Sequence, residues 1–558
     1  MAKRQFKAES KRLLDLMINS IYTHKEIFLR EIISNASDAC DKLCYQALTD
    51  DAVGMSRKDF KIEIKVDKEH RTLTVSDNGI GMDKEDLENN LGVIASSGSY
   101  KFKQEVGDDA KDTDVIGQFG VGFYSAFMVA DHITVVTRKY GTDAAWMWQS
   151  SGADGYTITE CERDAVGTDI IMHIKPDTDD EKYSEFLESW RLQELVRKYS
   201  DYIRFPIRME VSKTRRKEGS PDDKPEYETY QEEETLNSMV PIWQRRKSSV
   251  KPEEYNKFYR DKFHDYADPQ KVIAVSAEGA VTYKALLFIP GATPFDYYTK
   301  EYEKGLQLYS NGVLIMDKCA DLLPEHFRFV RGVVDSPDLS LNISRELLQH
   351  DRQLKVIAAN LEKKIKSELG KLLKDDREGY EKFWKNFGRQ IKYGVVSEYG
   401  AHKDLLQDLL LFYSSTQKKL VTLGEYVSRM PEEQKYIYYA SGDSVEAVDH
   451  LPQTELLKDR SMEILYFTDK TDEFIPDIFR TYGDKAFRSA VDGDLELGDE
   501  KQPETADHQE TLDFLKETLG SRVDQVKASG KLKSHPVCLT SGEGMTFEME
   551  KYLSLIHI

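Results

Sequence analysis

The sequence predicts an α+β protein with more than one domain. Apolar and polar residues alternate over residues 60–66 and 73–75, which is typical of half-buried strands. Residues 27–43 instead place apolar and polar side chains on opposite sides of one predicted helix. The length of 558 residues exceeds what a single hydrophobic core usually serves, so about three or four units are expected.

The elements of the N-terminal unit, residues 1–210, predict a layered fold. A short strand-like arm at Phe6 and an amphipathic helix come first, followed by the polar-faced helix and the hairpin of residues 60–75. Further strands are predicted around residues 133–137, 146–148, 156–159 and 170–174. This order favours helices packed on one face of a mostly antiparallel sheet.

The polar face of the predicted helix carries four side chains. Glu31, Asn35, Asp38 and Lys42 recur at i, i+4, i+7 and i+11, so they share one side of the helix. For a lone helix the ordinary interpretation is a solvated face. However, the amide oxygen of Asn35 is a neutral ligand suited to Mg²⁺, and Glu31 lies one turn away, where it could activate a water molecule.

Three glycine-containing segments suggest what that face contacts. Asp77, at a strand end, could accept a hydrogen bond from an adenine amino group, and Gly79 and Gly81 would let a flat base approach the backbone; a surface turn is the alternative. The glycines of residues 117–123 expose N–H groups suited to phosphate. Thr168 could bond the adenine edge. With the helix face, these segments predict an ATP site that lacks both the P-loop and the dinucleotide-binding patterns.

The same segments, in this order, resemble the ATPase superfamily that joins gyrase, the ninety-kilodalton heat-shock chaperones, sensor histidine kinases and MutL repair proteins. Residues 28–39 are similar to the chaperone family at almost every position. The resemblance continues through Trp243 and residues 309–313, and it is most specific at residues 329–336 and 341–349. It covers nearly the whole chain and is strongest to bacterial cytosolic members.

The resemblance implies an ATP-dependent molecular chaperone that acts on unfolded or partly folded client proteins through a nucleotide-driven clamp. It implies Glu31 and Arg345 as catalytic residues, with Arg345 reaching the γ-phosphate; on its own Arg345 could equally cap a helix. Asn35 is implied as the Mg²⁺ ligand beside ATP phosphates and water. The other residues implied to contact the nucleotide are Asp38, Asp77, Gly81, Met82, Asn90, Gly117, Gly120, Val121, Gly122, Phe123, Thr168, Asn342 and Gln349.

The segment from about Asn90 to Gly122 resembles the mobile lid of the family. Family members usually carry a lysine where this chain has Ser96, close to the nucleotide phosphates. We therefore expect Ser96 to alter nucleotide affinity or lid closure without removing the chemistry.

Composition excludes several classes of protein. A net charge of −21 with 32% charged residues argues against a dedicated nucleic-acid binder. The five cysteines lack metal-site spacing, which suits a reducing compartment, and the twelve histidines form no local zinc motif. No apolar run approaches the ~18 residues of a membrane span, and no signal-peptide pattern follows the start. We expect a cytoplasmic protein without membrane or nucleic-acid partners.

The predicted domains follow changes in composition. A short charged linker is expected at residues 211–240, then an α/β middle domain at 241–490 that carries Arg345 and a client surface. An acidic linker at 491–510 leads to a partial α+β dimerisation domain at 511–552 and a non-native tail at 553–558. The resemblance implies a homodimer when complete, and we expect the chain as given to be monomeric. The client surface would include aromatic residues that could equally form a core, namely Trp243, Phe295, Tyr297 and Tyr298.

Two other functions compete with the chaperone ATPase. A histidine kinase would place a phosphoacceptor histidine region before the ATPase, yet only His24 precedes Glu31. A DNA-topology or mismatch-repair ATPase would carry basic grooves, which the charge balance disfavours. A holdase that binds clients without turnover is distinguished by whether Glu31 and Arg345 support hydrolysis.

Overall fold

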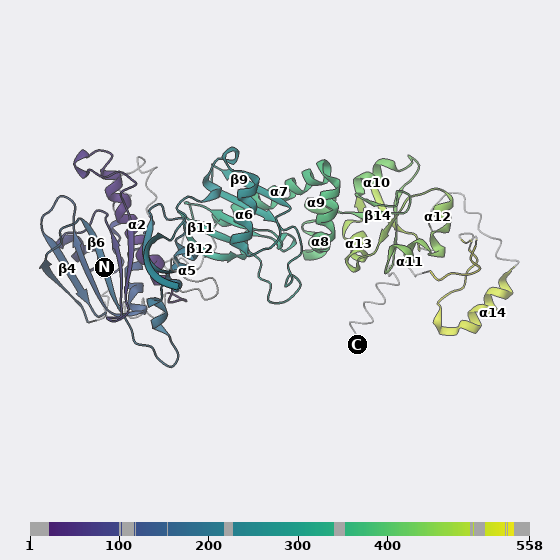
Figure 1. Ribbon diagram of the computed structural model, residues 1–558. Helices are drawn as coiled ribbons and strands as arrows, with labels where there is room; N and C mark the ends of the chain where they lie inside the picture. Colours follow the sequence, from purple (N-terminus) through teal and green to yellow (C-terminus); the bar gives the residue numbers. More distant parts are fainter. Residues whose placement is uncertain are drawn as a thin grey trace, which may run out of the picture. The chain divides into compact units, whose positions relative to one another are not determined.

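The computed structural model describes residues 22–99, 102, 116–117, 119–152, 154–216, 227–339, 352–491, 495, 508–529, 532 and 534–540. The chain divides into two compact units (Figure 1). The first falls within Met1–Phe288, Glu303–Leu322 and Val330–Ala359, and the second within Ile289–Tyr302, Leu323–Phe329 and Asn360–Ile558. Helices and sheets occur in both units, which confirms the predicted α+β class.

An eight-stranded sheet organises the N-terminal part of the first unit. Its strand order is β5-β4-β3-β6-β2-β1-β7-β8, and every neighbouring pair is antiparallel except β1 and β7. The sheet is therefore mostly antiparallel, as predicted. Its strands are β1 (Ile62–Asp67), β2 (Thr72–Asp77), β3 (Ala130–Arg138), β4 (Ala145–Ser150), β5 (Tyr156–Cys161), β6 (Gly167–Ile174), β7 (Ile207–Arg216) and β8 (Tyr227–Thr235).

The predicted polar-faced helix is α2 (Ile27–Gln46), and it packs against β2 and the 3₁₀ helix η3 (Gly122–Met128). Its buried Phe28 and Ile32 share one core with Ile64 of β1 and Val75 of β2. The alternation of the hairpin therefore does face a core, because successive strand side chains point to opposite faces. Two further helices of this part are α3 (Lys84–Asn90) and α5 (Ser189–Tyr199).

The segment from 211 to 240, predicted as a short charged linker, contains most of β7 and all of β8. Strands β7 and β8 pair in antiparallel register from Arg208↔Thr235 to Arg216↔Tyr227 and extend the sheet. The side chains of β8 are mostly exposed, so the apolar signal that marks a strand is weak there. The low hydrophobicity of this segment agrees with the exposure of β8, but it gave no indication that β7 and β8 pair. Residues 217–226 lie outside the described part.

A second sheet completes the first unit. Its strand order is β12-β11-β13-β10-β9, and α6 (Pro252–Phe263) places Phe258 and Phe263 against Phe288 of β10. The strands are β9 (Lys271–Ala277), β10 (Tyr283–Ile289), β11 (Leu306–Ser310), β12 (Val313–Cys319) and β13 (Arg331–Asp335).

The second unit combines two long helices with a six-stranded sheet of order β15-β14-β17-β16-β19-β18. The long helices are α7 (Arg352–Asp375), most of which belongs to this unit, and α8 (Arg377–Val396). The strands are β14 (Phe412–Ser414), β15 (Leu420–Val421), β16 (Tyr436–Ser441), β17 (Ile464–Phe467), β18 (Thr481–Tyr482) and β19 (Lys485–Ser489). Shorter helices are α9 (Lys403–Leu406), α10 (Leu423–Arg429), α11 (Val445–Asp449), α12 (Glu455–Asp459), α13 (Ile475–Phe479) and α14 (Gln509–Leu519).

The four aromatic residues predicted for a client surface divide into two pairs. Trp243 and Tyr297 are buried, whereas Phe295 and Tyr298 are exposed. Among the helices that the structure describes, none is long and apolar enough to cross a membrane.

Several predicted features fall outside the described residues. These are the N-terminal arm, much of the lid, most of the acidic linker, and the tail at 553–558.

Candidate active site

A cavity of about 420 Å³ in the first unit brings together most of the predicted site residues. Its volume is within the range usual for small-molecule sites, about 300–1,000 Å³. The predicted residues that line it are Glu31, Asn35, Asp77, Gly81, Met82, Asn90, Gly117, Gly120, Val121, Gly122, Phe123 and Thr168.

One end of the cavity is formed where β2 ends and β6 begins. Asp77 and Thr168 are directly opposite in the antiparallel pairing of these strands. The Asp77 carboxylate accepts a hydrogen bond from the Gly79 N–H at 2.9 Å, and the hydroxyls of Thr168 and Thr137 are 3.0 Å apart. Burial raises the pKa of the Asp77 carboxyl to about 7. This end thus offers a carboxylate and a hydroxyl side by side.

The opposite end is formed by Glu31 on α2. Arg30, which is 1% exposed, donates from Nε and Nη2 to Oε1 of Glu31 at 3.0 and 2.7 Å. The other carboxylate oxygen, Oε2, lies against Gly122, where an added Cβ would approach it to 2.6 Å. Arg30 therefore fixes the orientation of Glu31 and leaves Oε2 on the side of the glycine-rich segment.

Glycine contacts show how the two ends are separated along α2. A Cβ at Gly79, beside Asp77, would lie 2.3 Å from the carbonyl carbon of Ala39, so this turn packs directly on the helix backbone. Gly122 packs on Glu31, eight residues earlier on the same helix. At 1.5 Å per residue the two contacts are about 12 Å apart along the helix axis. The cavity is thus long enough to receive different parts of an extended ligand at its two ends.

Asp38 has a different position from the other predicted residues, because it does not line the cavity. Its two carboxylate oxygens accept hydrogen bonds from the N–H groups of Ile116 and Gly117 at 2.7 and 2.8 Å. Burial raises the pKa of this carboxyl, although Lys42 and the two N–H donors favour its charged form. Asp38 therefore positions the start of the glycine-rich segment.

Comparisons with known proteins bear on the activity of this cavity. Residues 22–165 match the family described as histidine kinase-, DNA gyrase B-, and HSP90-like ATPase, and residues 185–233 and 220–555 match the Hsp90 protein family. The chain belongs to the Hsp90 family. It is accordingly an ATPase and an ATP-dependent molecular chaperone.

The Hsp90-family assignment is supported by relatives along the whole chain. Chaperone protein HtpG of Clostridium acetobutylicum is 58% identical over 560 residues, covering 100% of this chain and 89% of the relative. HtpG of Bacillus subtilis is 58% identical over 560 residues, with 99% and 89% covered. HtpG of Halalkalibacterium halodurans is 57% identical over 558 residues, with 99% and 88% covered.

Sequence reasoning missed three charged residues of this Hsp90-family site. Arg30 lies next to Leu29 on the buried side of α2. A single arginine among the apolar residues of this helix is the sequence signal that could have marked it as part of the site. Lys42 was placed on the polar face without a role, and it lines the cavity; burial lowers the pKa of its ammonium group. Lys139, just after β3, also lines the cavity and pairs with Asp83 and Asp86 at 2.7 Å each.

The structure describes Ser96 but not the three predicted residues of the middle domain. Ser96 lines the cavity, and its backbone lies so close to Gly120 that an added Cβ there would approach it to 2.4 Å. Asn342, Arg345 and Gln349 lie outside the described residues, so their roles stay predictions.

Proposed function

We propose that this chain binds ATP with its adenine at the Asp77 end of the cavity and its phosphates at the Glu31 end. The observation that carries the proposal is that Asp77 and Glu31 line one cavity, while Gly79 beside Asp77 and Gly122 beside Glu31 contact α2 at points about 12 Å apart along its axis. The Asp77 carboxylate can accept a hydrogen bond from the adenine amino group, and the Thr168 hydroxyl lies beside it.

At the phosphate end, Glu31 is proposed to orient and activate the attacking water. Its Oε2 atom is suited to this role because Arg30 occupies Oε1 and holds the side chain in place. Asn35 lines the cavity one helical turn away, where its amide oxygen suits Mg²⁺, and bound Mg²⁺ would neutralise phosphate charge. The N–H groups of residues 120–123 are proposed to hold the phosphates, since the Gly117 N–H already donates to Asp38.

Arg345 is proposed as the second catalytic residue, with Asn342 and Gln349 in the same loop. A guanidinium can stabilise the charge that develops on a transferred phosphoryl group. Closure of the lid and docking of this loop would then couple hydrolysis to a clamp that acts on clients.

The client surface is proposed to include Phe295 and Tyr298, which are 105% and 61% exposed. Exposed aromatic residues are suited to contact the apolar segments of partly folded proteins. We also propose that the protein works as a homodimer in the cytoplasm, as the family resemblance implies. Light scattering coupled to size exclusion measures the oligomeric state.

Steady-state ATPase assays of wild type and Glu31→Ala, each with and without an unfolded client, test the proposal. Glu31→Ala should retain ATP binding while turnover falls by ~10²–10⁴-fold, the usual effect of removing a positioned acid–base group. The matched control is Glu85→Ala, an exposed acidic residue of α3 outside the cavity, which should leave turnover unchanged. Unchanged turnover in Glu31→Ala would reject the assignment, and client protection by an inactive variant would favour a holdase.

A further inference from the structure

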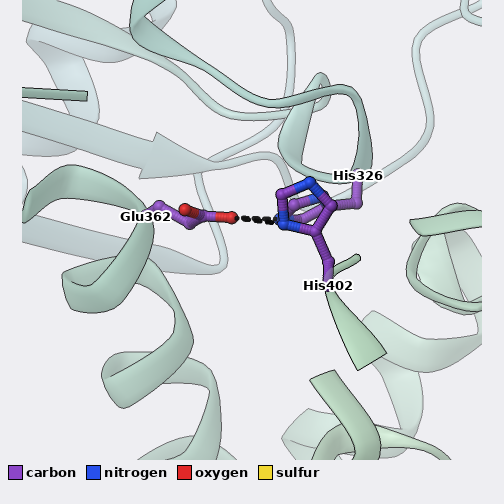
Figure 2. A group of neighbouring side chains, drawn as sticks. All are labelled: His326, Glu362 and His402. Atoms are coloured by element: carbon purple, nitrogen blue, oxygen red, sulfur yellow. Dashed lines mark ion pairs between the residues drawn. The ribbon is translucent and has the colours of Figure 1, made fainter. Parts of the chain in front are cut away.

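Three side chains from distant parts of the sequence converge in the second unit, away from the ATP cavity. His326 belongs to the 3₁₀ helix η8 (Glu325–Phe327), Glu362 to α7, and His402 directly precedes α9. Figure 2 shows the Glu362 carboxylate directed at the imidazole rings of both histidines. The proposed ATPase chemistry uses none of these residues.

The distances within this group match those between ligands of one metal ion. Oε1 of Glu362 is 3.0 Å from Nε2 of His326 and 3.2 Å from Nδ1 of His402, and the three ligand atoms all lie within 4.8 Å of one another. In a tetrahedral zinc site, bonds of about 2.0–2.2 Å place neighbouring ligand atoms about 3.3–3.6 Å apart, slightly more than these two separations. Small side-chain rotations would therefore centre an ion among the three atoms.

The buried atoms of the group contact one another. The His326 side chain is 2% exposed, and its Nε2 meets Oε1 of Glu362 as an ion pair at 3.0 Å; neither atom has a hydrogen-bond partner beyond this group among the described residues. A metal ion between them would satisfy both atoms at once.

The surrounding structure holds the ligands in place. A Cβ at Gly394 of α8 would lie 2.3 Å from Cβ of His326, so only glycine lets the helix approach this closely. The two histidine rings pack with centroids 4.6 Å apart. On the far side of His402, Nε2 is 3.8 Å from Oε2 of the largely exposed Glu398, which is too far for a hydrogen bond.

We propose that His326, Glu362 and His402 bind a single Zn²⁺ ion that fastens α7 to the segments before α9 and around η8. Two imidazoles and one carboxylate form a known protein ligand set for zinc, and the fourth position is left to water because His402 is partly exposed. The ion would connect three segments that are far apart in the sequence. Hard ions such as Mg²⁺ prefer all-oxygen sites and should not compete.

The test is calorimetric titration of the whole, tag-free, chelator-treated chain with ZnCl₂. Wild type should bind one Zn²⁺ saturably at micromolar concentration, gain a higher melting temperature, and show no comparable heat with MgCl₂. Co²⁺ in place of Zn²⁺ should give visible absorption bands of a tetrahedral site. Absence of saturable zinc binding would overturn the proposal.

Variants locate the site. Glu362→Gln and His402→Ala each remove a direct ligand. Each should therefore weaken zinc binding by more than about 100-fold, the upper end of the effect of losing a second-shell partner, which is about 10–100-fold. The matched control is His173→Ala, which removes an exposed histidine whose Nδ1 contacts Asp131 at 2.6 Å without a third ligand. It should bind zinc as wild type does.

Two outcomes of the variant series would reject the site. Unchanged affinity in both Glu362→Gln and His402→Ala would assign the zinc to other residues, such as the five cysteines. A zinc-dependent rise in melting temperature that persists in these two variants would do the same. Melting of the metal-free variants shows whether each one is folded, and His402→Ala is at a partly exposed position.

Discussion

The side chain of Arg30 determines where the Glu31 carboxylate points. Both nitrogens that contact Glu31 meet the same oxygen, Oε1, and the pair is almost completely buried. Arginine forms this two-pronged contact with a rigid planar group, whereas lysine offers a single flexible point charge. Arg30 is therefore expected to act as a positioning residue for Glu31.

Arg30→Lys should lower ATP turnover while leaving ATP affinity nearly unchanged. The charge is retained, but the carboxylate loses its fixed orientation, and a misplacement of about 1 Å can reduce the rate by up to ~10²-fold. Single-turnover hydrolysis together with equilibrium ATP binding measures the two effects separately. Equal turnover in Arg30→Lys and wild type would show that orientation by Arg30 is not required.

The raised pKa of Asp77 predicts a pH-dependent affinity for adenine. Below pH 7 the carboxyl becomes protonated in the free protein and can no longer serve as a pure acceptor for the amino group. Affinity should thus rise with pH and level off above 7. Between pH 8.5 and 5.5 it should fall by about 30-fold, since each pH unit below the pKa reduces the ionised fraction about tenfold.

Adenosine is the suitable probe for this titration because it carries no phosphate that ionises in the same range. Asp41→Asn is the matched control, since burial also raises the pKa of Asp41 to about 7 but this residue does not line the cavity. Its pH profile should match wild type, and Asp77→Asn should lose adenosine binding. A flat wild-type profile would contradict the role of Asp77.

At the scale of elements, one buried ion pair joins α8 to the 3₁₀ helix η12 (Lys470–Phe474) in the second unit. Nζ of Lys392 lies 2.7 and 2.8 Å from the two carboxylate oxygens of Asp472, and both residues are buried. Removing one partner of such a pair typically costs about 3–5 kcal/mol, because the other charge stays buried without compensation.

Lys392→Met should therefore lower the melting temperature of the second unit strongly. Adding Asp472→Asn should recover much of the loss, since it removes the uncompensated charge and keeps an acceptor for the Asp469 N–H. Lys371→Met is the control: the Lys371 side chain is 57% exposed and its partner Glu368 keeps a second ion pair with Lys364, so the effect should stay within about 0.5 kcal/mol. Differential scanning calorimetry measures all four chains. No recovery in the double variant would show that the pair acts through packing instead.

For the whole molecule, hydrolysis is expected to need residues beyond the ATP cavity. Arg345→Ala in the full chain should retain ATP affinity and lose turnover, by as much as ~10³–10⁵-fold if chemistry limits the rate and by less if closure does. Steady-state assays measure the loss of turnover, and equilibrium binding measures whether ATP affinity is retained. Wild-type turnover in Arg345→Ala would remove this residue from the mechanism.

A fragment of residues 1–240 gives a second measure of this dependence. It keeps β7 and β8, whereas a fragment ending at Met209 would cut through β7 and lose β8 from the sheet. The longer fragment should bind ATP and hydrolyse it poorly, and the shorter one should melt at a lower temperature. Full activity in the longer fragment would show that the ATPase unit is sufficient.

The amino-acid sequence by itself predicted the local elements and most of the residues that line the cavity of the first unit. The period of two in residues 60–75 and the polar face of α2 are local patterns, so they predicted β1, β2 and the helix with the cavity on its polar side. The family resemblance supplied the identities of the lining residues. It could do so because these residues lie in short motifs, which are also local patterns. Strand β8 escaped prediction since its pairing with β7, and not its own hydrophobicity, holds it in the sheet.

Tertiary structure alone decided which charged groups meet. Arg30 contacts Oε1 of Glu31 because both side chains are buried in the folded unit. The sequence pattern marked the Arg30 side of the helix only as apolar. His326, Glu362 and His402 are separated by 36 and 40 residues, so no local motif could mark them, and the sequence argued against a zinc site. They converge because η8 and α9 both contact α8, and such contacts depend on the whole fold and not on spacing along the chain.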